Sequence, residues 1–169
     1  RKGGAVDAFG SALTRDGRAT DTTLLHDAAA CDHLAMVREL LKRGASVDLP
    51  TSFGCTALMD AAFSGHFSIL LGLLQHSANP DLQDSKGFTA LMGAADQGHE
   101  PCVQALLRAK ANTELLDNDG HTVLQYAEGH TAIAQLIRQH AASPQTAAAK
   151  EAARAEELIA VLKLSACYR

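Results

Sequence analysis

A repeat with a period of 33 residues is the feature that most restricts how this chain of 169 residues can fold. Thr23 recurs as Thr56, Thr89 and Thr122, and the same step relates further columns of Leu, Ala and His in each unit. These columns are Leu25, Leu58, Leu91 and Leu124; Ala28, Ala61, Ala94 and Ala127; His33, His66 and His99; Leu40-Leu41, Leu73-Leu74 and Leu106-Leu107; and Ala45, Ala78 and Ala111. Self-similarity at a fixed step indicates a stack of similar units rather than a chain folded around one compact core.

Each unit has the pattern of two short helices. The threonine at its start predicts a helix N-cap, because the hydroxyl can accept a hydrogen bond from a free amide of the first turn. In the second unit, Leu58, Ala61 and Ala62 have the spacing of one helical face. Gly65 then allows the left-handed residue that ends a helix, and an apolar stripe follows for the second helix. The small alanines favour close stacking of neighbouring helices.

The segment from Asp84 to His99, DSKGFTALMGAADQGH, resembles the ankyrin-repeat pattern D-x-x-G-x-T-P-L-H-x-A-A-x-x-G-H. The resemblance covers residues 18–141 as four units, at about 18–50, 51–83, 84–116 and 117–141. It implies an all-α fold, an ankyrin-repeat solenoid of helix-turn-helix units with β-turn or hairpin fingers.

Departures from the pattern predict local differences between the units. The glycine that should follow each second helix is present only as Gly44, and Ser77, Lys110 and His140 stand in its place elsewhere. A residue with a side chain costs about 1 kcal/mol in the left-handed region, so we expect looser helix ends in units two to four. In unit four, Gly129-His130 arrives two residues early, which predicts a truncated first helix.

Two segments lie outside the repeats. Residues 1–17 form an N-terminal extension or degenerate cap, for which we expect a short helix laid over the first unit, built on Val6, Ala8, Phe9, Ala12 and Leu13. Residues 142–169 contain a break at Ser143-Pro144 and then an Ala-rich C-terminal helix from about 147 to 165. This helix has two interpretations, a cap over the end of the solenoid or a helix for a partner or for dimerisation.

Composition narrows the class of protein. Residues 18–141 carry 8 Lys and Arg against 14 Asp and Glu, an acidic balance that disfavours nucleic-acid binding. No apolar run is long enough for a membrane span, and no signal peptide is visible. The four cysteines form no C-x-x-C pair, so we expect a reducing compartment, the cytoplasm or the nucleus. Because the sequence does not begin with Met, we expect a fragment of a longer protein.

Residues that could carry chemistry have structural explanations. His26, His33, His66, His99 and His130 fall at repeated helix starts, so each takes an equivalent backbone position. Cys102 aligns with core positions, whereas Cys31 and Cys55 align with variable surface positions. A metal site at Cys31 and His33 would lack a second ligand pair. Because no H-E-x-x-H, P-loop or G-x-S-x-G motif occurs, we expect no catalytic residue, no metal and no cofactor.

The resemblance implies a concave, protein-binding surface made of turn tips and inner helices. Its predicted residues are Ser52, Phe53, Cys55, Ser85, Lys86, Phe88, Asn118, Asp119 and His121 at the tips, with Ala30, Cys31, Asp60, Phe63, Ser64, Asp96 and Gln97 on the inner helices. Three of the five phenylalanines belong to this set, although Phe88 has the alternative of packing on its own turn. Asp27 and Asp60 are one period apart and so are expected to stack, with Asp96 nearby. An acidic groove with apolar spots favours a basic, partly apolar peptide or helix, and the alternative is a solvated acidic face without a ligand.

These observations favour a monomeric, non-catalytic protein-interaction module or scaffold. The alternative is a targeting or substrate-recruiting domain of a larger enzyme, such as a kinase, an acyltransferase or a ubiquitin ligase. A free-standing enzyme is disfavoured because no catalytic constellation is visible.

Overall fold

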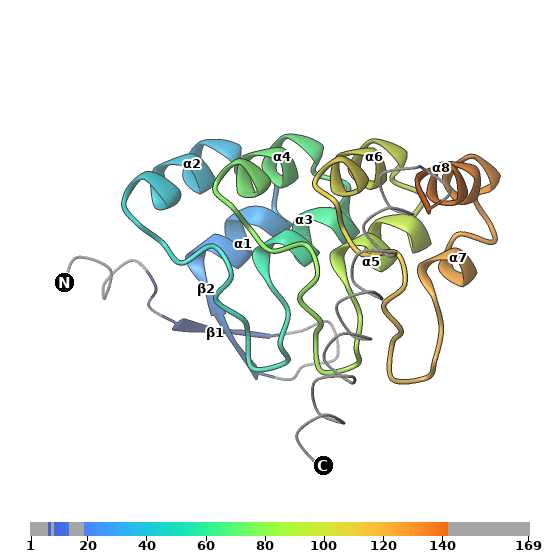
Figure 1. Ribbon diagram of the computed structural model, residues 1–169. Helices are drawn as coiled ribbons and strands as arrows, with labels where there is room; N and C mark the ends of the chain where they lie inside the picture. Colours follow the sequence, from blue (N-terminus) through green and yellow to red (C-terminus); the bar gives the residue numbers. More distant parts are fainter. Residues whose placement is uncertain (1–6, 8, 14–18, 142–169) are drawn as a thin grey trace, which may run out of the picture.

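The computed structural model describes residues 7, 9–13 and 19–141 of the chain (Figure 1). This part contains one antiparallel hairpin and eight helices, namely β1 (Phe9–Leu13), β2 (Ala19–Thr23), α1 (Leu24–Ala30), α2 (Leu34–Lys42), α3 (Ala57–Ser64), α4 (Phe67–Gln75), α5 (Ala90–Asp96), α6 (Glu100–Arg108), α7 (Val123–Tyr126) and α8 (Thr131–Ala141). Consecutive helices pair, so the described residues form four helix-turn-helix units.

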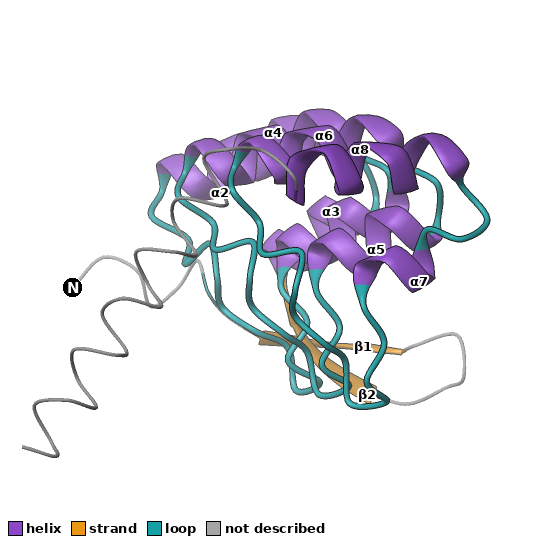
Figure 2. Ribbon diagram, turned by 45° about the vertical axis from the view of Figure 1, so that its right-hand side comes forward, coloured by secondary structure: helices purple, strands orange, loops and turns teal. Residues whose placement is uncertain are grey.

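The units stack into two layers of helices. Figure 1 shows α1, α3, α5 and α7 in one row, the inner layer, and α2, α4, α6 and α8 in a second row, the outer layer. Each helix packs against its counterpart in the next unit. The loops between units extend beyond the inner layer to one side as finger-like turns (Figure 2). The predicted solenoid of stacked helix pairs with fingers is confirmed.

The threonine column begins the inner helices, as predicted. Thr56 Oγ1 accepts a hydrogen bond from the Met59 amide at 3.4 Å, and Thr89 Oγ1 accepts one from the Met92 amide at 3.2 Å. In unit four the bond runs the other way, because the Thr122 amide donates to the Gln125 side chain at 2.7 Å. These bonds satisfy amides that have no partner within the helix.

Small side chains occupy fully buried positions of the inner helices. Ala28, Ala61, Ala94 and Ala127 are at most 1% exposed, and Leu25, Leu58 and Leu91 of the same layer are at most 3% exposed. A methyl group lets adjacent helices approach closely, which explains why the core needs no tryptophan. Cys102 lies in this core, as its alignment predicted.

Backbone hydrogen bonds join the second finger to the third and the third finger to the last. The Ser85 amide donates to the Phe53 carbonyl at 2.9 Å, and the Asn118 amide donates to the Lys86 carbonyl at 2.9 Å. The Asn118 side chain also donates to the Ser85 carbonyl at 3.0 Å. The fingers therefore form a continuous row beside the inner layer.

The expected helix near the N-terminus is wrong for the part that the structure describes. Residues 9–13 form β1, which pairs with β2 in a register that runs from Phe9 opposite Thr23 to Leu13 opposite Ala19. Gly10 weakens a helix here, and the Thr-rich segment 19–23 offers a strand partner. The hairpin is thus the first finger of the stack. Val6 and Ala8 lie outside the described residues, as does the C-terminal helix predicted within 142–169.

The left-handed residue expected after each second helix is present in three of the four units, and the looser helix ends stay a prediction. Gly44, Ser77 and Lys110 all have a positive φ, at 85°, 64° and 63°. The expectation for His140 is wrong, because α8 continues through this residue to Ala141. The truncated first helix of unit four is confirmed, since α7 has only 4 residues.

Candidate functional site

A cavity of about 350 Å³ lies between the second and third units, where the third finger meets α3 and α5. Unit two contributes Cys55, Met59, Asp60, Phe63 and Ser64, and unit three contributes Asp84, Lys86, Phe88, Thr89 and Gly93. The bond between the Ser85 amide and the Phe53 carbonyl holds the two fingers side by side at this place. The volume is at the small end of the range for ligand pockets, so it suits one large side chain better than a cofactor.

The cavity brings together six of the predicted site residues, which are Cys55, Asp60, Phe63, Ser64, Lys86 and Phe88. The other ten lie outside it. Ser52, Phe53 and Ser85 are exposed on the second and third fingers, Asp96 and Gln97 are exposed at the end of α5, and Asn118, Asp119 and His121 are exposed on the last finger. Ala30 and Cys31, at the end of α1, are exposed too and also lie outside it. We use "the groove" for the cavity together with the exposed residues of the second and third fingers.

Four cavity residues were missed by the sequence prediction, namely Met59, Asp84, Thr89 and Gly93. Gly93 occupies the position that carries Asp27, Asp60 and Tyr126 in the other units. This change of residue type within a repeated column could have indicated Gly93 from the sequence. Asp84 closes its own turn, because its Oδ1 accepts hydrogen bonds from the Lys86 and Phe88 amides at 2.8 Å each.

The phenylalanines of the groove differ in exposure. Phe63 is 52% exposed and Phe53 is 40% exposed, so both present a ring to the surface. Phe88 is half-buried and meets Tyr126 edge to face, with ring centroids 4.9 Å apart. Phe88 therefore packs against Tyr126 of the next unit while another part of it lines the cavity. Packing of Phe88 on its own turn, the alternative given above, stays a prediction.

Asp60 is the most perturbed carboxyl group of the cavity. Burial raises its pKa to about 7, and the charge of Asp27 on the neighbouring helix raises it further in the same direction. This interaction agrees with the predicted stacking of Asp27 and Asp60. Asp96 does not line the cavity. Within the described ranges, the Asp60 carboxyl has no hydrogen-bond or ion-pair partner.

The surroundings of Cys55 keep its thiol protonated. Burial raises its pKa to about 11, and the nearby carboxylates of Asp60 and Asp84 act in the same direction. Its Sγ lies 3.9 Å from Asp84 Oδ2, at the distance of a weak S–H donor. A thiol needs its ionised form to act as a nucleophile, so Cys55 contributes to the cavity wall as a neutral group.

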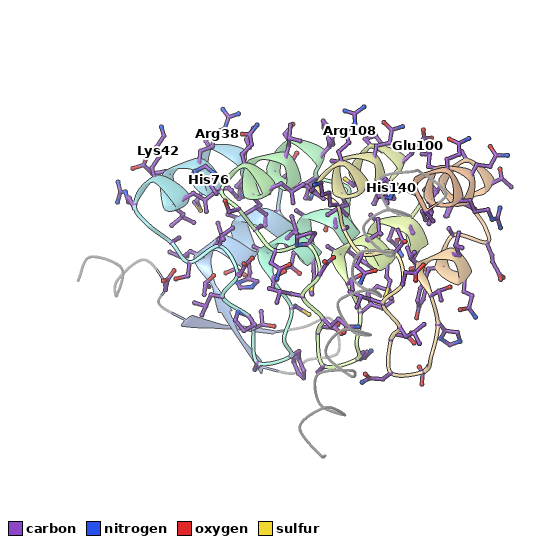
Figure 3. All side chains as sticks on the ribbon, viewed as in Figure 1. Arg38, Lys42, His76, Glu100, Arg108 and His140 are labelled. Carbon is purple, nitrogen blue, oxygen red and sulfur yellow. The ribbon has the colours of Figure 1, made fainter. Side chains whose placement is uncertain are left out.

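Charge is distributed unequally between the layers. The inner helices carry Asp27, Asp60 and Asp96 and have no lysine or arginine. In the outer layer, Arg38, Lys42 and Arg108 project away from the inner helices (Figure 3). The face that carries the groove is therefore the acidic one.

The repeated histidines join neighbouring units, in agreement with their predicted structural role. The Nε2 atom of His66 donates to the Ala30 carbonyl at 3.0 Å, that of His99 to the Phe63 carbonyl at 3.0 Å, and that of His130 to the Asp96 carbonyl at 3.2 Å. The buried His26 bonds the Cys55 carbonyl at 3.1 Å in the same sense. Each ring thus satisfies a carbonyl of an adjacent unit.

Asp117, Asp119 and His121 bring possible metal-ligand atoms within 4.8 Å of one another on the last finger. The Asp117 carboxylate already accepts hydrogen bonds from the Asp119 and His121 amides and from the Tyr126 hydroxyl. These bonds, the one from Tyr126 first, lower the pKa of Asp117 to about 2. The cluster therefore closes the finger and anchors Tyr126.

Comparison with known families identifies the repeat. None of the helices in the described ranges combines the length and the hydrophobicity of a membrane-spanning segment. A comparison with curated proteins found no match for this chain. The family model for ankyrin repeats, in three copies, matches residues 6–84 and again residues 71–148. Because these matches span most of the sequence and the fold consists of stacked helix pairs with fingers, the chain belongs to the ankyrin-repeat family, whose members are generally protein-interaction modules.

Proposed function

We propose that this chain is a non-catalytic, monomeric protein-interaction module or scaffold whose groove binds a basic, partly apolar peptide or helix of another protein. One observation carries the proposal. A single cavity contains both an exposed ring, Phe63, and a carboxyl group without a described partner, Asp60.

The apolar part of the groove supports a protein partner. Phe53 on the second finger and Phe63 on α3 both expose large rings of unit two, and the half-buried Phe88 of unit three lines the cavity with Phe63. Aromatic side chains in a partly enclosed site are frequent anchors of protein interfaces, because they bury a large area at low cost in conformational entropy.

Charge supports a basic partner. Asp60 and Asp84 line the cavity, and Lys86 on the third finger is its one basic side chain. The inner helices carry no lysine or arginine. An acidic surface accelerates association with a basic segment and disfavours acidic competitors. Binding should therefore weaken as the salt concentration rises.

Selection from a random-peptide library tests the proposal. The full chain is the bait, and we expect the selected peptides to combine Lys or Arg with apolar residues. Phe63→Ala and Asp60→Lys should each weaken binding at least about tenfold, the effect of losing one interface anchor. Phe67→Ala is the matched control, because Phe67 is 41% exposed on the outer helix α4. Equal losses in Phe63→Ala and Phe67→Ala, or none in the groove variants, would reject the groove.

The same groove would serve a targeting or substrate-recruiting domain of a larger enzyme, such as a kinase, an acyltransferase or a ubiquitin ligase. The sequence of the full transcript distinguishes this alternative, since it requires a catalytic domain in the same protein.

We further propose a cytoplasmic or nuclear location, which the free thiols of Cys31, Cys55 and Cys102 support. Imaging of the tagged full-length protein tests this location.

A further inference from the structure

Gly93 lies inside α5, although nothing in the fold requires glycine there. Its φ is not positive, unlike that of Gly65 or Gly98, which follow inner helices. A Cβ at this position would lie 3.7 Å from Phe63 Cβ and 3.7 Å from Phe88 Cε1, which are ordinary contacts. Glycine inside a helix costs about 0.5–1 kcal/mol relative to alanine. The α5 helix is therefore less stable here, and glycine leaves a space on the cavity floor that could hold a methyl group in ordinary contact with Phe63 and Phe88.

The open space is specific to the third unit. The equivalent positions carry Asp27, Asp60 and Tyr126, each with a side chain that extends from the helix. We call the space above Gly93 the Gly93 slot and define it by Gly93, Phe63, Phe88, Asp60 and Asp84, which all line the same cavity. Its two aromatic walls come from consecutive units, so the stacking of the repeats creates it.

The charge of the slot is not neutralised by the described residues. Asp60 has no ion pair there, and the Asp84 carboxylate is held in place by backbone amides. Lys86 also lines the cavity, but no ion pair joins it to either carboxylate. A half-buried carboxyl group without a cation is costly to ionise, and a cation supplied from outside would offset this cost.

We propose that the Gly93 slot receives one arginine side chain of the bound partner, with the stem between Phe63 and Phe88 and the guanidinium at Asp60 and Asp84. This inference deepens the proposed function and rests on it. Arginine fits better than lysine for two reasons. Its planar group stacks on aromatic faces and pairs with carboxylates through several donors, and it is less strongly hydrated than an ammonium group.

Capped tripeptides test the slot without knowledge of the partner. The ¹⁵N-labelled full chain is titrated with Gly-Arg-Gly, Gly-Lys-Gly and Gly-citrulline-Gly and followed by NMR. We expect the amide shifts to concentrate at Gly93 and its neighbours. Citrulline keeps the shape of arginine without its charge, so its peptide should bind at least about tenfold more weakly. Equal binding of the arginine and citrulline peptides, tighter binding of the lysine peptide, or no shift at Gly93 would overturn the proposal.

Gly93→Ala separates binding from stability. The added methyl group fills the floor of the slot, so arginine-peptide binding should fall at least about tenfold while Tm rises through helix propensity. Gly72→Ala is the matched control, because Gly72 lies inside α4 and a Cβ there meets no atom within 4 Å. It should raise Tm without changing binding. Unchanged binding in Gly93→Ala would overturn the slot, and a rise in Tm excludes unfolding as the cause of a loss.

Failure of this inference can be distinguished from failure of the proposed function. If library-selected peptides need Phe63 and Asp60 but bind Gly93→Ala as tightly as the unaltered chain, the groove stands and the slot is rejected. If the arginine tripeptide binds at Gly93 but no selected peptide depends on the groove, the slot stands and the wider function is rejected.

Discussion

The His99 ring connects the third unit to the end of α3, where its Nε2 donates to the Phe63 carbonyl at 3.0 Å. The same ring lies against Gly65, and a Cβ at Gly65 would approach His99 Cε1 to 2.6 Å. Phe63 is also a wall of the groove. A repeated structural histidine therefore holds the backbone of a residue that we assign to binding.

Replacement of His99 by alanine should destabilise the fold by about 1–2 kcal/mol, because it leaves the Phe63 carbonyl without its donor. Urea denaturation of the full chain measures the change. His33→Ala is the control, since the His33 ring is exposed and no described unit precedes it. It should change stability by less than about 0.5 kcal/mol. Similar losses in both variants would contradict an inter-unit role for the histidine column.

Gly98→Ala should be more destabilising than Gly44→Ala. Both glycines have a positive φ, at 75° and 85°, so both substitutions carry a backbone cost of about 1–2 kcal/mol. A Cβ at Gly98 would also lie 2.5 Å from His130 Cε1, whereas one at Gly44 meets nothing within 4 Å. Thermal unfolding should show a larger fall in Tm for Gly98→Ala, and equal shifts would mean that the His130 ring moves away freely.

Lys110→Gly should stabilise the protein by about 1 kcal/mol. Lys110 follows α6 with a φ of 63°, a conformation that glycine adopts without the steric cost of a side chain. The adjacent Ala109 has a φ of −75°, and Ala109→Gly should destabilise because glycine loses more conformational freedom on folding. Denaturant midpoints for the two variants should thus move in opposite directions.

Asp60→Asn should stabilise the protein at pH 8 and have little effect at pH 4. Folding raises the pKa of Asp60 from 3.8 to about 7, so the folded state binds its proton more tightly than the unfolded state does. Stability consequently falls as the pH rises between these two values, and the full penalty remains above pH 7. The neutral amide of asparagine removes this penalty, so the free energy of unfolding should rise by about 1–3 kcal/mol at pH 8. A variant whose advantage is independent of pH would contradict this explanation.

The contribution of His26 to the free energy of unfolding should depend on pH in the opposite direction to that of Asp60. Its Nδ1 accepts from the Thr23 amide, so Nε2 carries the proton that is donated to the Cys55 carbonyl. Burial first of all lowers its pKa below the ordinary value of 6.5, so the unfolded state binds the proton more tightly. Its contribution to stability is therefore complete above about pH 6.5 and is lost on acidification. His26→Asn should be less stable at pH 7 but should lose less stability than the unaltered chain between pH 7 and pH 5.

Features that recur from unit to unit could be predicted from the sequence. The threonine caps, the buried alanines and the left-handed turns at Gly44, Ser77 and Lys110 depend on local conformation, and the 33-residue step displays each of them several times. The helix predicted over residues 9–13 was wrong, because these residues form a strand through pairing with residues 19–23. Local pattern could not reveal that partner.

The repeating helix pairs and most of the side chains on the groove face could be predicted from period and residue type, because these select an amphipathic unit that must stack. Which of those side chains share a cavity depends on how the units pack against one another. The slot above Gly93 needs Phe63 and Asp60 from one unit and Phe88 and Asp84 from the next, and the hydrogen bond from the Ser85 amide to the Phe53 carbonyl joins the fingers of these two units. Contacts between units depend on how closely the alanine-rich helices approach, and no single unit contains that information.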